Sequence, residues 1–384
     1  MPNKVMYLTS AMDNESFKEY LRDWTVAPNL SNQNFHNKLI RAIATTNDVD
    51  VICYRSINIH FKKFELPAKV VKENNIHWKY TYCSHSKVAK RLYLFSRIKR
   101  VTLFDQKAVF VDALNLSLLK VALKIRKKYK IKVIAVVTDN PNNISYTTHL
   151  YKKRVLKLGK KSDAFITLTP KLNELYNPNG KPNVIIDGIS EPFLSFAERK
   201  VNGDYIYFGG SLMRRYGVYN LIEAFKNLKR DDLKLVLCGH HVNKDELKKA
   251  IDKSENIVYF GSVDYFNNLA LEKYALVAVN PRPKDEKLDE YSVPSKTLEF
   301  LSNSCLSISV DNPTLKAKYE DCIIWAKSGS VKDLEDALRR ALALTEEEKA
   351  SIIKRGFERV NDNTSVGRVS SLIDFLLTEF FFNK

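Results

Sequence analysis

Short apolar runs alternate with helix-like segments along the first half of the chain. Each run has the length of a buried strand, and the segments between them have the spacing of amphipathic helices. The predicted strands are residues 5–8, 49–53, 109–111, 133–137 and 164–168, and the predicted helices are residues 35–44, 116–129 and 150–158. Strands separated by helices favour a parallel sheet with helices on both faces.

A stretch rich in proline, glycine and asparagine interrupts this alternation near the middle of the chain. Residues 177–193 read NPNGKPNVIIDGISEPF, and residues 197–204 are polar. Such a composition is typical of a loop or linker, so we expect a domain boundary there. The alternation then starts again, with predicted strands at residues 205–208, 233–238, 257–260, 276–279, 306–310 and 322–326 and helices at 218–228, 331–343 and 346–359.

Two successive segments of this kind predict an α/β protein with two doubly wound, Rossmann-like domains that face each other across a cleft. We assign residues 1–195 to the first domain and residues 196–365 to the second. Open α/β sheets bind ligands at the carboxyl ends of their strands, so the cleft is the expected active site. The remaining segment is residues 366–384, and its very apolar stretch at 370–382 must pack against other parts of the chain.

The composition agrees with a large folded protein. Of the 384 residues, 45% are hydrophobic and 11% are aromatic, which supports full hydrophobic cores and argues against disorder. No run approaches the roughly 18 apolar residues of a membrane-spanning helix, and we see no signal-peptide pattern. The five cysteines are scattered without a C-x-x-C pair, so we interpret them as reduced thiols of a cytoplasmic protein.

The net charge of +18 comes entirely from the first half of the chain. Residues 1–200 contain 35 Lys and Arg against 16 Asp and Glu, whereas residues 201–384 contain 27 against 28. The basic residues concentrate at 87–100, 120–132 and 152–161. This pattern indicates either solvated helix faces or attraction to a polyanion, such as anionic lipid headgroups or nucleic acid. No nucleic-acid-binding module is recognisable, so we expect no nucleic-acid partner.

A loop with glycines and arginines follows the predicted strand at residues 205–208. Gly210 and Ser211 come soon after this strand, and Arg214 and Arg215 precede a predicted helix. Glycine allows close approach of the backbone to a ligand, and arginine carries a permanent charge suited to phosphate. The loop is therefore a candidate diphosphate site, although glycines at strand ends and surface arginines are also common without a ligand.

A second candidate site lies at a predicted helix start. Pro294, Ser295 and Lys296 precede apolar residues at helical spacing, and Glu299 follows about one turn later. Free N–H groups at a helix N-terminus bind phosphate oxygens, and an acidic side chain can bind ribose hydroxyls. We expect Ser292 or Ser295 to cap the helix and Pro294 to lie in its first turn. The alternative is a capped helix with a solvated glutamate.

Signatures of metal sites and of other nucleophiles are weak. His240 and His241 follow a predicted strand without a nearby ligand partner, so we expect no zinc site there. His36 is expected at a helix start near the cleft rather than in a metal site. The sequence contains no P-loop and no G-x-S-x-G nucleophile elbow.

In their order and spacing, the two candidate sites resemble the donor-binding half of glycosyltransferase family 4, whose members have the GT-B fold. The family pattern G-x-L-x-x-x-K-G-x-x-x-L-I-x-A-F is similar to GSLMRRYGVYNLIEAF at residues 210–225. PSKTLEFL at 294–301 is similar to the second half of the family's paired-glutamate motif. Segments 233–239 and 328–334 extend the resemblance to most of residues 203–345. The x-P-S-K-x-x-E form resembles a bacterial subgroup that builds surface polysaccharides and glycoconjugates.

The resemblance implies a retaining glycosyltransferase with the nucleotide sugar on the second domain and the acceptor on the first. The donor-binding residues that it implies are Gly210, Ser211, Arg214, Arg215, Pro294, Ser295, Lys296 and Glu299. Arginines and a helix N-terminus would hold the diphosphate without a metal, so no cofactor is expected besides the nucleotide-sugar co-substrate. The resemblance also implies that the C-terminal helix packs back on the first domain.

Two positions depart from the family pattern. Tyr216 stands where the family has a lysine, so phosphate binding would pass to Arg215 or Arg214. Tyr291 stands where the first glutamate of the paired motif is expected, and Glu290 is its neighbour. We therefore expect Arg215 to act on the leaving diphosphate and Glu290 to contact the sugar.

Asp139 is the expected catalytic residue of the first domain. It follows the predicted strand at residues 133–137, where the family often has a histidine near the transferred sugar. It could bind a sugar hydroxyl, stabilise positive charge on the anomeric carbon, or accept the acceptor proton. The alternative is an Asx cap before Pro141. Asp112, which ends the preceding predicted strand, is a further candidate.

The hypothesis from the sequence is a glycosyltransferase that moves a sugar from a nucleotide sugar to a lipid-linked or other glycan in bacterial polysaccharide or glycoconjugate synthesis. The basic first domain would attach peripherally to the anionic inner face of the plasma membrane. Three alternatives stay open. They are a cytoplasmic protein glycosyltransferase, a non-catalytic GT-B partner of another glycosyltransferase, and a nucleic-acid-binding protein. The absent first glutamate supports the second, and charge alone suggests the third.

Overall fold

A computed structural model of the chain divides into two compact units. Its described residues are 3–25, 30–55, 57–58, 60–84, 106–144, 147–191, 198–240, 244–252 and 254–378. Unit 1 comprises Met1–Ile189 with Val366–Lys384, and unit 2 comprises Ser190–Ser365. The division falls at residue 190 rather than at residue 196. The basic stretch 87–100 and the terminal Phe380, Phe381 and Phe382 lie outside the described residues.

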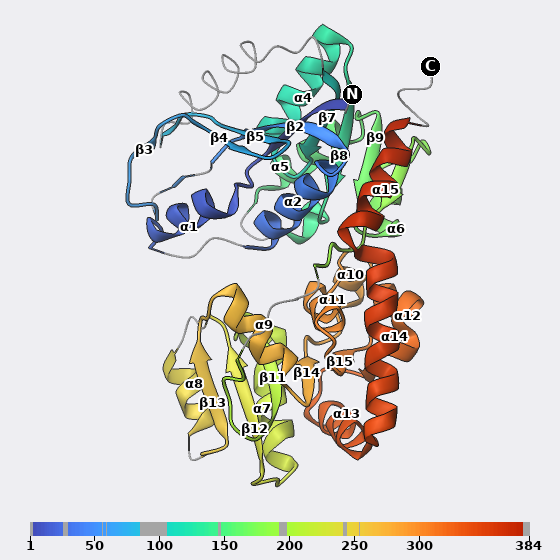
Figure 1. Ribbon diagram of the computed structural model, residues 1–384. Coiled ribbons are helices and arrows are strands. Elements are labelled where there is room, and N and C mark those ends of the chain that lie inside the picture. The colour runs from blue at the N-terminus through green and yellow to red at the C-terminus, as the bar shows by residue number, and fades with distance from the viewer. Residues whose placement is uncertain are drawn as a thin grey trace. The chain divides into compact units, whose positions relative to one another are not determined.

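Unit 1 is built on an eight-stranded sheet (Figure 1). The strand order is β10-β9-β8-β7-β1-β2-β5-β4, and all neighbouring strands are parallel except β4 and β5. The strands are β1 (Asn3–Thr9), β2 (Asn47–Cys53), β4 (Lys69–Glu73), β5 (Ile76–Tyr80), β7 (Gln106–Asp112), β8 (Lys132–Val137), β9 (Ala164–Thr167) and β10 (Asn183–Ile185). A separate antiparallel pair joins β3 (Glu65–Leu66) to β6 (Cys83–Ser84). The five strands predicted for this half are confirmed, while β3, β4, β5, β6 and β10 were not predicted.

Helices cover both faces of this sheet. They are α1 (Asn14–Arg22), α2 (Leu30–Ile43), α4 (Leu116–Tyr129), α5 (His149–Gly159), α6 (Pro170–Tyr176) and α15 (Val366–Leu377), with the 3-10 helix η1 (Pro141–Asn143). Alternate residues of β1 enter two cores, as the two-residue period of a strand requires. Val5 and Tyr7 pack with α2 and α15, whereas Met6 and Leu8 pack with α4. The last helix therefore completes one face of the unit 1 sheet.

Unit 2 is built on a six-stranded sheet in which all strands are parallel. The strands, in their order across the sheet, are β13 (Ile257–Gly261), β12 (Leu233–Cys238), β11 (Asp204–Gly209), β14 (Val277–Asn280), β15 (Ser307–Val310) and β16 (Ile324–Ala326). The chain order runs in opposite directions from β11 and β14, so the topological switch point lies between these two strands. Ligands of open α/β sheets bind outside the carboxyl ends of the strands at such a point.

The helices of unit 2 also lie on two faces of the sheet. They are α7 (Val218–Asn227), α8 (Lys244–Ile251), α9 (Tyr265–Lys273), α10 (Glu286–Asp289), α11 (Ser295–Ser302), α12 (Pro313–Tyr319), α13 (Val331–Ala343) and α14 (Glu346–Thr364), with η2 (Arg214–Tyr216) and η3 (Glu320–Cys322). Ile206 and Phe208 of β11 pack with α7 and α13, whereas Tyr205 and Tyr207 pack with α9 and α11. The predicted strands and helices of this half are confirmed, while α8, α9, α10 and α12 were not predicted.

The turn into α7 depends on glycine at position 217. Gly217 has a φ of 79°, in the left-handed region that favours glycine. A Cβ atom at this position would lie 2.0 Å from the carbonyl oxygen of Pro281, in the loop after β14. Asn220 of α7 donates a hydrogen bond to Gly329 O (2.6 Å), in the loop before α13. The loops after β11 and β14 and the loop before α13 therefore meet at one place.

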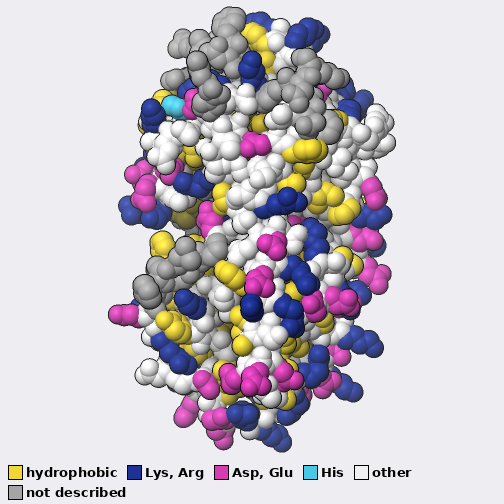
Figure 2. All heavy atoms as spheres, turned by 45° about the vertical axis from the view of Figure 1, so that its right-hand side comes forward, with side chains coloured by type: hydrophobic (Ala, Val, Ile, Leu, Met, Phe, Trp, Pro, Cys, Tyr) yellow, Lys and Arg dark blue, Asp and Glu magenta, His cyan; other side chains and the backbone are white. Residues whose placement is uncertain are grey.

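The distribution of charge differs between the units. On the face shown in Figure 2, acidic and basic side chains are intermixed over unit 2. In unit 1, residues 113–162 include 13 Lys and Arg and a single acidic residue, Asp139. Helices α4 and α5 of this segment pack against each other on one side of the sheet, so their exposed basic residues share that side. Within the described part of the chain, no helix combines the length and apolar character needed to cross a membrane.

We predict that Gly217→Ala destabilises unit 2 by about 3 kcal/mol or more. The left-handed backbone costs alanine about 1–2 kcal/mol, and the contact with Pro281 O adds a steric cost of similar size. Urea unfolding followed by tryptophan fluorescence measures the loss. Gly203→Ala is the matched control, because Gly203 has a φ of 80° but nothing within 4 Å of an added Cβ. Equal losses for the two variants would contradict the close contact.

Candidate active site

Hydrogen bonds to two strands fix the N-terminus of α11 at the carboxyl edge of the unit 2 sheet. Thr297, in the first turn of α11, accepts a hydrogen bond from Asn280 Nδ2 at the end of β14 (3.0 Å). The Thr297 hydroxyl in turn donates to Ser309 Oγ of β15 (3.3 Å). Because β14 borders the switch point, the positive end of the α11 dipole lies where an anionic ligand can bind.

The first turn of α11 differs in detail from the prediction. Pro294 is the N-cap residue and the helix begins at Ser295, so the proline precedes the first turn. Ser292 does not cap the helix, because its hydroxyl donates to Leu288 O (3.1 Å). The predicted serine cap is therefore wrong. A proline N-cap offers no side-chain acceptor, so the first N–H groups, including that of Lys296, can serve a ligand.

The loop after β11 starts beside the same switch point. Gly210 follows β11 directly, and Ser211 comes next as a partly buried residue. Arg214 and Arg215 lie in η2, and both are exposed. The sequence prediction that these four residues share a loop at a strand end is confirmed, and their function stays a prediction.

The two arginines of this loop have different surroundings. Arg214 Nε donates to Glu246 Oε1 of α8 (2.5 Å), and its guanidinium lies 4.4 Å from the Tyr219 ring centroid. Arg215 stacks over Tyr216, with 4.9 Å from its guanidinium carbon to the ring centroid. Among the described residues, Arg215 forms no ion pair. Arg215 is therefore the cation of this loop that is available to a ligand, and its guanidinium is supported by the Tyr216 ring.

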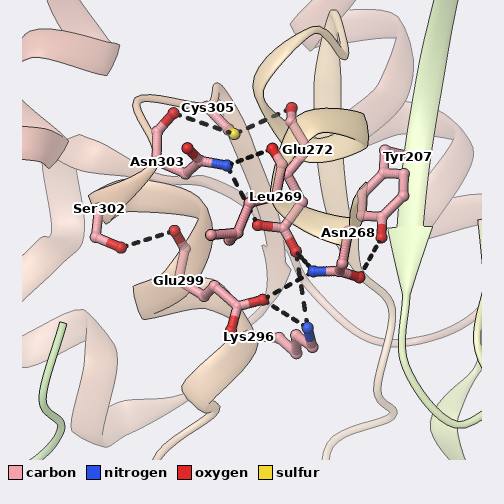
Figure 3. A network of polar contacts seen from close by, with 9 residues as sticks. All are labelled: Tyr207, Asn268, Leu269, Glu272, Lys296, Glu299, Ser302, Asn303 and Cys305. Atoms are coloured by element: carbon pink, nitrogen blue, oxygen red, sulfur yellow. Dashed lines mark hydrogen bonds and ion pairs between the residues drawn. The ribbon is translucent and has the colours of Figure 1, made fainter. Parts of the chain in front are cut away.

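Glu299 lies within a network of polar side chains in the second turn of α11 (Figure 3). Glu299 Oε1 accepts hydrogen bonds from Lys296 Nζ (2.6 Å) and from Asn268 Nδ2 (3.2 Å). Asn268 Nδ2 also donates to Glu272 Oε1 (2.6 Å), and Lys296 Nζ lies 3.7 Å from that same oxygen. The Glu272 and Glu299 carboxylates therefore share both an amide and an ammonium.

Further hydrogen bonds tie this network to its neighbouring elements. The Tyr207 hydroxyl of β11 donates to Asn268 Oδ1 (2.7 Å). Asn303, which follows α11, donates through Nδ2 to Leu269 O (2.8 Å), and the same nitrogen lies 3.5 Å from Glu272 Oε2. The network thus joins β11, α9 and α11 on one face of the unit 2 sheet. The sequence motifs include Lys296 and Glu299 but not their partners on α9.

Burial and neighbouring charges shift the titration of this network. Glu272 is fully buried, and burial raises its pKa well above the ordinary value, with a further rise from the Glu299 carboxylate. Burial alone would lower the pKa of Lys296, but the two carboxylates outweigh burial and raise it. Burial and the Glu299 carboxylate also raise the pKa of Tyr265, at the start of α9. Lys296 therefore stays protonated at neutral pH and binds both glutamates.

Between β14 and α11, the buried acid is Asp289, the last residue of α10, whereas the sugar contact expected of its neighbour Glu290 stays a prediction. The Glu290 side chain is exposed. Asp289 is buried, accepts a hydrogen bond from Asp285 N (2.9 Å), and lies 3.8 Å from Arg282 Nη2. Arg282 and Asp289 line a small polar cavity that Pro294 also borders. Arg282 Nη2 is buried without a hydrogen-bond partner among the described residues. This arginine is therefore a candidate ligand-binding residue that the sequence motifs do not include.

In unit 1, Asp139 follows β8 by two residues and is partly exposed. Its Oδ1 accepts a hydrogen bond from the Asn140 N–H (2.7 Å). Asn140, and not Asp139, caps η1 by accepting from Asn142 N (3.0 Å). The Asx cap considered for Asp139 therefore belongs to the next residue, and the Asp139 carboxylate lies at the carboxyl edge of the unit 1 sheet.

Asp112 and His36 form a second polar cluster in unit 1. His36 is completely buried in the middle of α2, so its expected place at a helix start is wrong. Its Nδ1 lies 2.6 Å from the Tyr7 hydroxyl, and its Nε2 lies 3.8 Å from Asp112 Oδ1 at the end of β7. Burial lowers the pKa of His36, and Asp112 opposes this effect. His241 lies outside the described residues, and within them no group of three or more acidic, histidine or cysteine side chains could hold a metal ion.

We predict that Glu272→Gln makes the stability of the protein less dependent on pH. A carboxyl whose pKa is raised on folding contributes most stability below its unfolded pKa, near 4.3, and loses that contribution as the pH rises. The wild type should therefore lose up to about 1.4 kcal/mol per pH unit from this group above pH 5, and the variant should not. Urea unfolding between pH 5 and pH 8 measures the difference. Glu358→Gln, at an exposed position of α14, is the control, and parallel profiles for all three proteins would contradict the prediction.

Comparison with known proteins relates this geometry to glycosyltransferases. Residues 191–359 match the family model described as Glycosyl transferases group 1. Sucrose-phosphate synthase from Thermosynechococcus elongatus is similar over 100% of both chains, with a TM-score of 0.71 and 13% identity. Trehalose 6-phosphate synthase from Burkholderia multivorans is similar over 98% of both chains, with a TM-score of 0.67 and 10% identity.

A third structure, from E. coli, is described as trehalose-6-phosphate bound with UDP-2-fluoro glucose. It matches over 97% of this chain and 99% of its own, with a TM-score of 0.68 and 13% identity. No curated protein sequence matches the chain. At such identities the likeness establishes the fold, which is GT-B as predicted. The chain therefore has the GT-B fold, and its residues 191–359 match the family model of the glycosyl transferases group 1.

Proposed function

We propose that the protein is a nucleotide-sugar-dependent glycosyltransferase that acts with retention of configuration. The observation that carries the proposal is the position of the α11 N-terminus and Glu299 at the switch point of the unit 2 sheet, beside the loop that contains Arg215. The match of this same unit to glycosyl transferases group 1 supports a nucleotide sugar as the donor. Similarity to the family 4 pattern supports retention.

The diphosphate of the donor would lie between the loop 210–217 and the start of α11. Backbone N–H groups near Ser295 and Lys296 would bind phosphate oxygens, together with the positive end of the helix dipole. The Arg215 guanidinium would neutralise the charge that grows on the diphosphate as the bond to the sugar breaks, an effect that is stronger in the transition state than in the ground state. In this proposal, arginine and the helix N-terminus act without a metal.

Glu299 would bind the ribose of the donor. A carboxylate accepts hydrogen bonds from paired hydroxyls, and the hydrogen bond from the Lys296 ammonium holds the Glu299 carboxylate in place. Glu290 and Asp139 are the proposed contacts to the sugar and the acceptor. In the transfer, the acceptor hydroxyl oxygen bonds to the anomeric carbon, the bond to the diphosphate breaks, and the acceptor proton passes to a base, for which Asp139 is the candidate.

For the acceptor, we propose a lipid-linked glycan at an anionic membrane surface, in bacterial polysaccharide or glycoconjugate synthesis. The support is the segment 113–162, with 13 basic residues and one acidic residue. Each basic residue near an anionic bilayer contributes about 1 kcal/mol, so several of them suffice for peripheral binding. The second candidate is a cytoplasmic protein glycosyltransferase, for which the same surface would bind an acidic polypeptide. A non-catalytic donor-binding partner is the third, and it is favoured by the outward position of Glu290.

We predict that Glu299→Gln raises the Kd of the donor by about 10-fold or more, because a hydrogen bond to a charged group contributes about 1.5–3 kcal/mol. A thermal-shift screen of the wild type with UDP-, GDP- and dTDP-sugars identifies the donor, and calorimetry then gives the Kd values. Glu290→Gln should alter transfer but not donor affinity by this amount. Unchanged affinity in Glu299→Gln would contradict the ribose assignment, and binding without transfer to any acceptor would favour the non-catalytic partner.

We also predict that the protein floats with liposomes that contain anionic lipid and not with neutral ones, and that salt reduces the effect. The variant K120E/K124E/K127E reverses exposed charges of α4 and should lose flotation. The control K248E/K249E/K354E makes the same change in charge on unit 2 and should float more strongly than the α4 variant. Equal flotation of the two variants would contradict a membrane role for unit 1.

A further inference from the structure

We propose that Asn268 and Glu272 of α9 are positioning residues that hold Glu299 in the orientation that binds the ribose. The inference rests on the proposed function and extends the donor site to a helix that no sequence motif marks. Its basis is the geometry of the shared network: one amide and one ammonium, each placed between the same two carboxylates.

The Asn268 side-chain amide has a fixed orientation and contacts both glutamate side chains. The Tyr207 hydroxyl donates to Asn268 Oδ1, which places the amide nitrogen on the opposite side, toward the glutamates. This nitrogen has two hydrogens, and it has two acceptors, Glu272 Oε1 at 2.6 Å and Glu299 Oε1 at 3.2 Å. Rotation of the amide would set Oδ1 against two carboxylates, so the observed orientation is the one that satisfies every partner.

Gly209 connects the Asn268 amide to the loop that contains Arg214 and Arg215. A Cβ atom at Gly209 would lie 2.2 Å from the Tyr207 hydroxyl oxygen and 3.0 Å from Asn268 Oδ1. The last residue of β11 therefore packs directly on the hydrogen bond that orients the amide. Through Gly209 and Tyr207, the network supports both the start of the proposed phosphate loop and the proposed ribose carboxylate.

Glu272 explains why a lysine is needed beside Glu299. The Glu272 side chain is fully buried, and it lies near a second carboxylate whose side chain is 24% exposed. At low dielectric the Glu299 carboxylate raises the pKa of Glu272 beyond the effect of burial, and the Lys296 ammonium between the two side chains opposes this rise. The lysine side chain is thus committed to the two glutamates, which leaves its backbone N–H as its contribution to phosphate binding.

A carboxylate held by two donors on rigid elements gives a pre-organised acceptor for the ribose hydroxyls. The entropy of ordering Glu299 is then lost on folding and not on binding of the donor. Removal of Asn268 should therefore weaken the part of the donor affinity that depends on the ribose hydroxyls, and it should leave the part that depends on the diphosphate.

The test is calorimetric titration of the full chain with UDP and GDP and with their 2′,3′-dideoxy counterparts. For the nucleotide that the wild type binds more tightly, Asn268→Ala should raise the Kd roughly 5- to 10-fold, and Tyr207→Phe should raise it roughly 2- to 5-fold. Both variants should bind the dideoxy nucleotide as the wild type does. Asn267→Ala is the matched control, because Asn267 lies on the same helix and bonds to Asp264 at the surface.

The outcomes separate this inference from the proposed function. If Glu299→Gln loses affinity while Asn268→Ala and Tyr207→Phe bind like Asn267→Ala, the positioning role is wrong and the donor site stands. If a variant raises the Kd of the ribose nucleotide and that of the dideoxy nucleotide equally, the network only stabilises unit 2 in general. This result would also overturn the positioning role. If the wild type binds dTDP but neither UDP nor GDP, the donor site stands without a pair of ribose hydroxyls, and this inference is wrong. If it binds none of the three nucleotides, the proposed function fails, and this inference fails with it.

Discussion

The buried carboxylate of Glu272 is the constraint on which the candidate donor site depends. A charge or a polar acid in the interior must be paired, and the pairing here recruits Lys296 from α11 and Asn268 from its own helix. Both partners also bind Glu299, so the need to satisfy one buried group fixes the position of a second, more exposed one. The hydrogen bonds and the ion pair that satisfy a buried side chain thereby also fix the position of Glu299.

Close backbone contacts bring the other parts of the site to the same edge. Gly217 allows the loop after β11 to touch the loop after β14, and Gly209 allows it to lie on the Tyr207 hydroxyl. Thr297 ties the start of α11 to β14 and β15. The start of α11, the exposed Arg215 and the Glu299 carboxylate are therefore brought to the edge of one sheet by close backbone contacts and hydrogen bonds.

Local patterns predicted the central strands of the unit 1 sheet, the strands of the unit 2 sheet and the longer helices, since strand and helix periodicity are properties of neighbouring residues. The motif glycines, arginines and Glu299 were also visible, because they lie within two short segments. The polar network on α9 could not be predicted from the sequence, because its contacts join residues 207, 268, 272 and 296, which are far apart in the chain. A buried glutamate also leaves no local signal in the sequence. The inward turn of Asp289 and the engagement of Arg214 by Glu246 likewise depend on tertiary contacts.

The most direct test is a crystal structure of the protein with a bound nucleoside diphosphate. The account predicts that phosphate oxygens accept hydrogen bonds from the N–H groups at the start of α11 and from Arg215, and that the ribose hydroxyls lie on Glu299 with the Lys296 and Asn268 contacts retained. A nucleotide bound elsewhere on the chain, or one at this edge whose ribose lies away from Glu299, would contradict it.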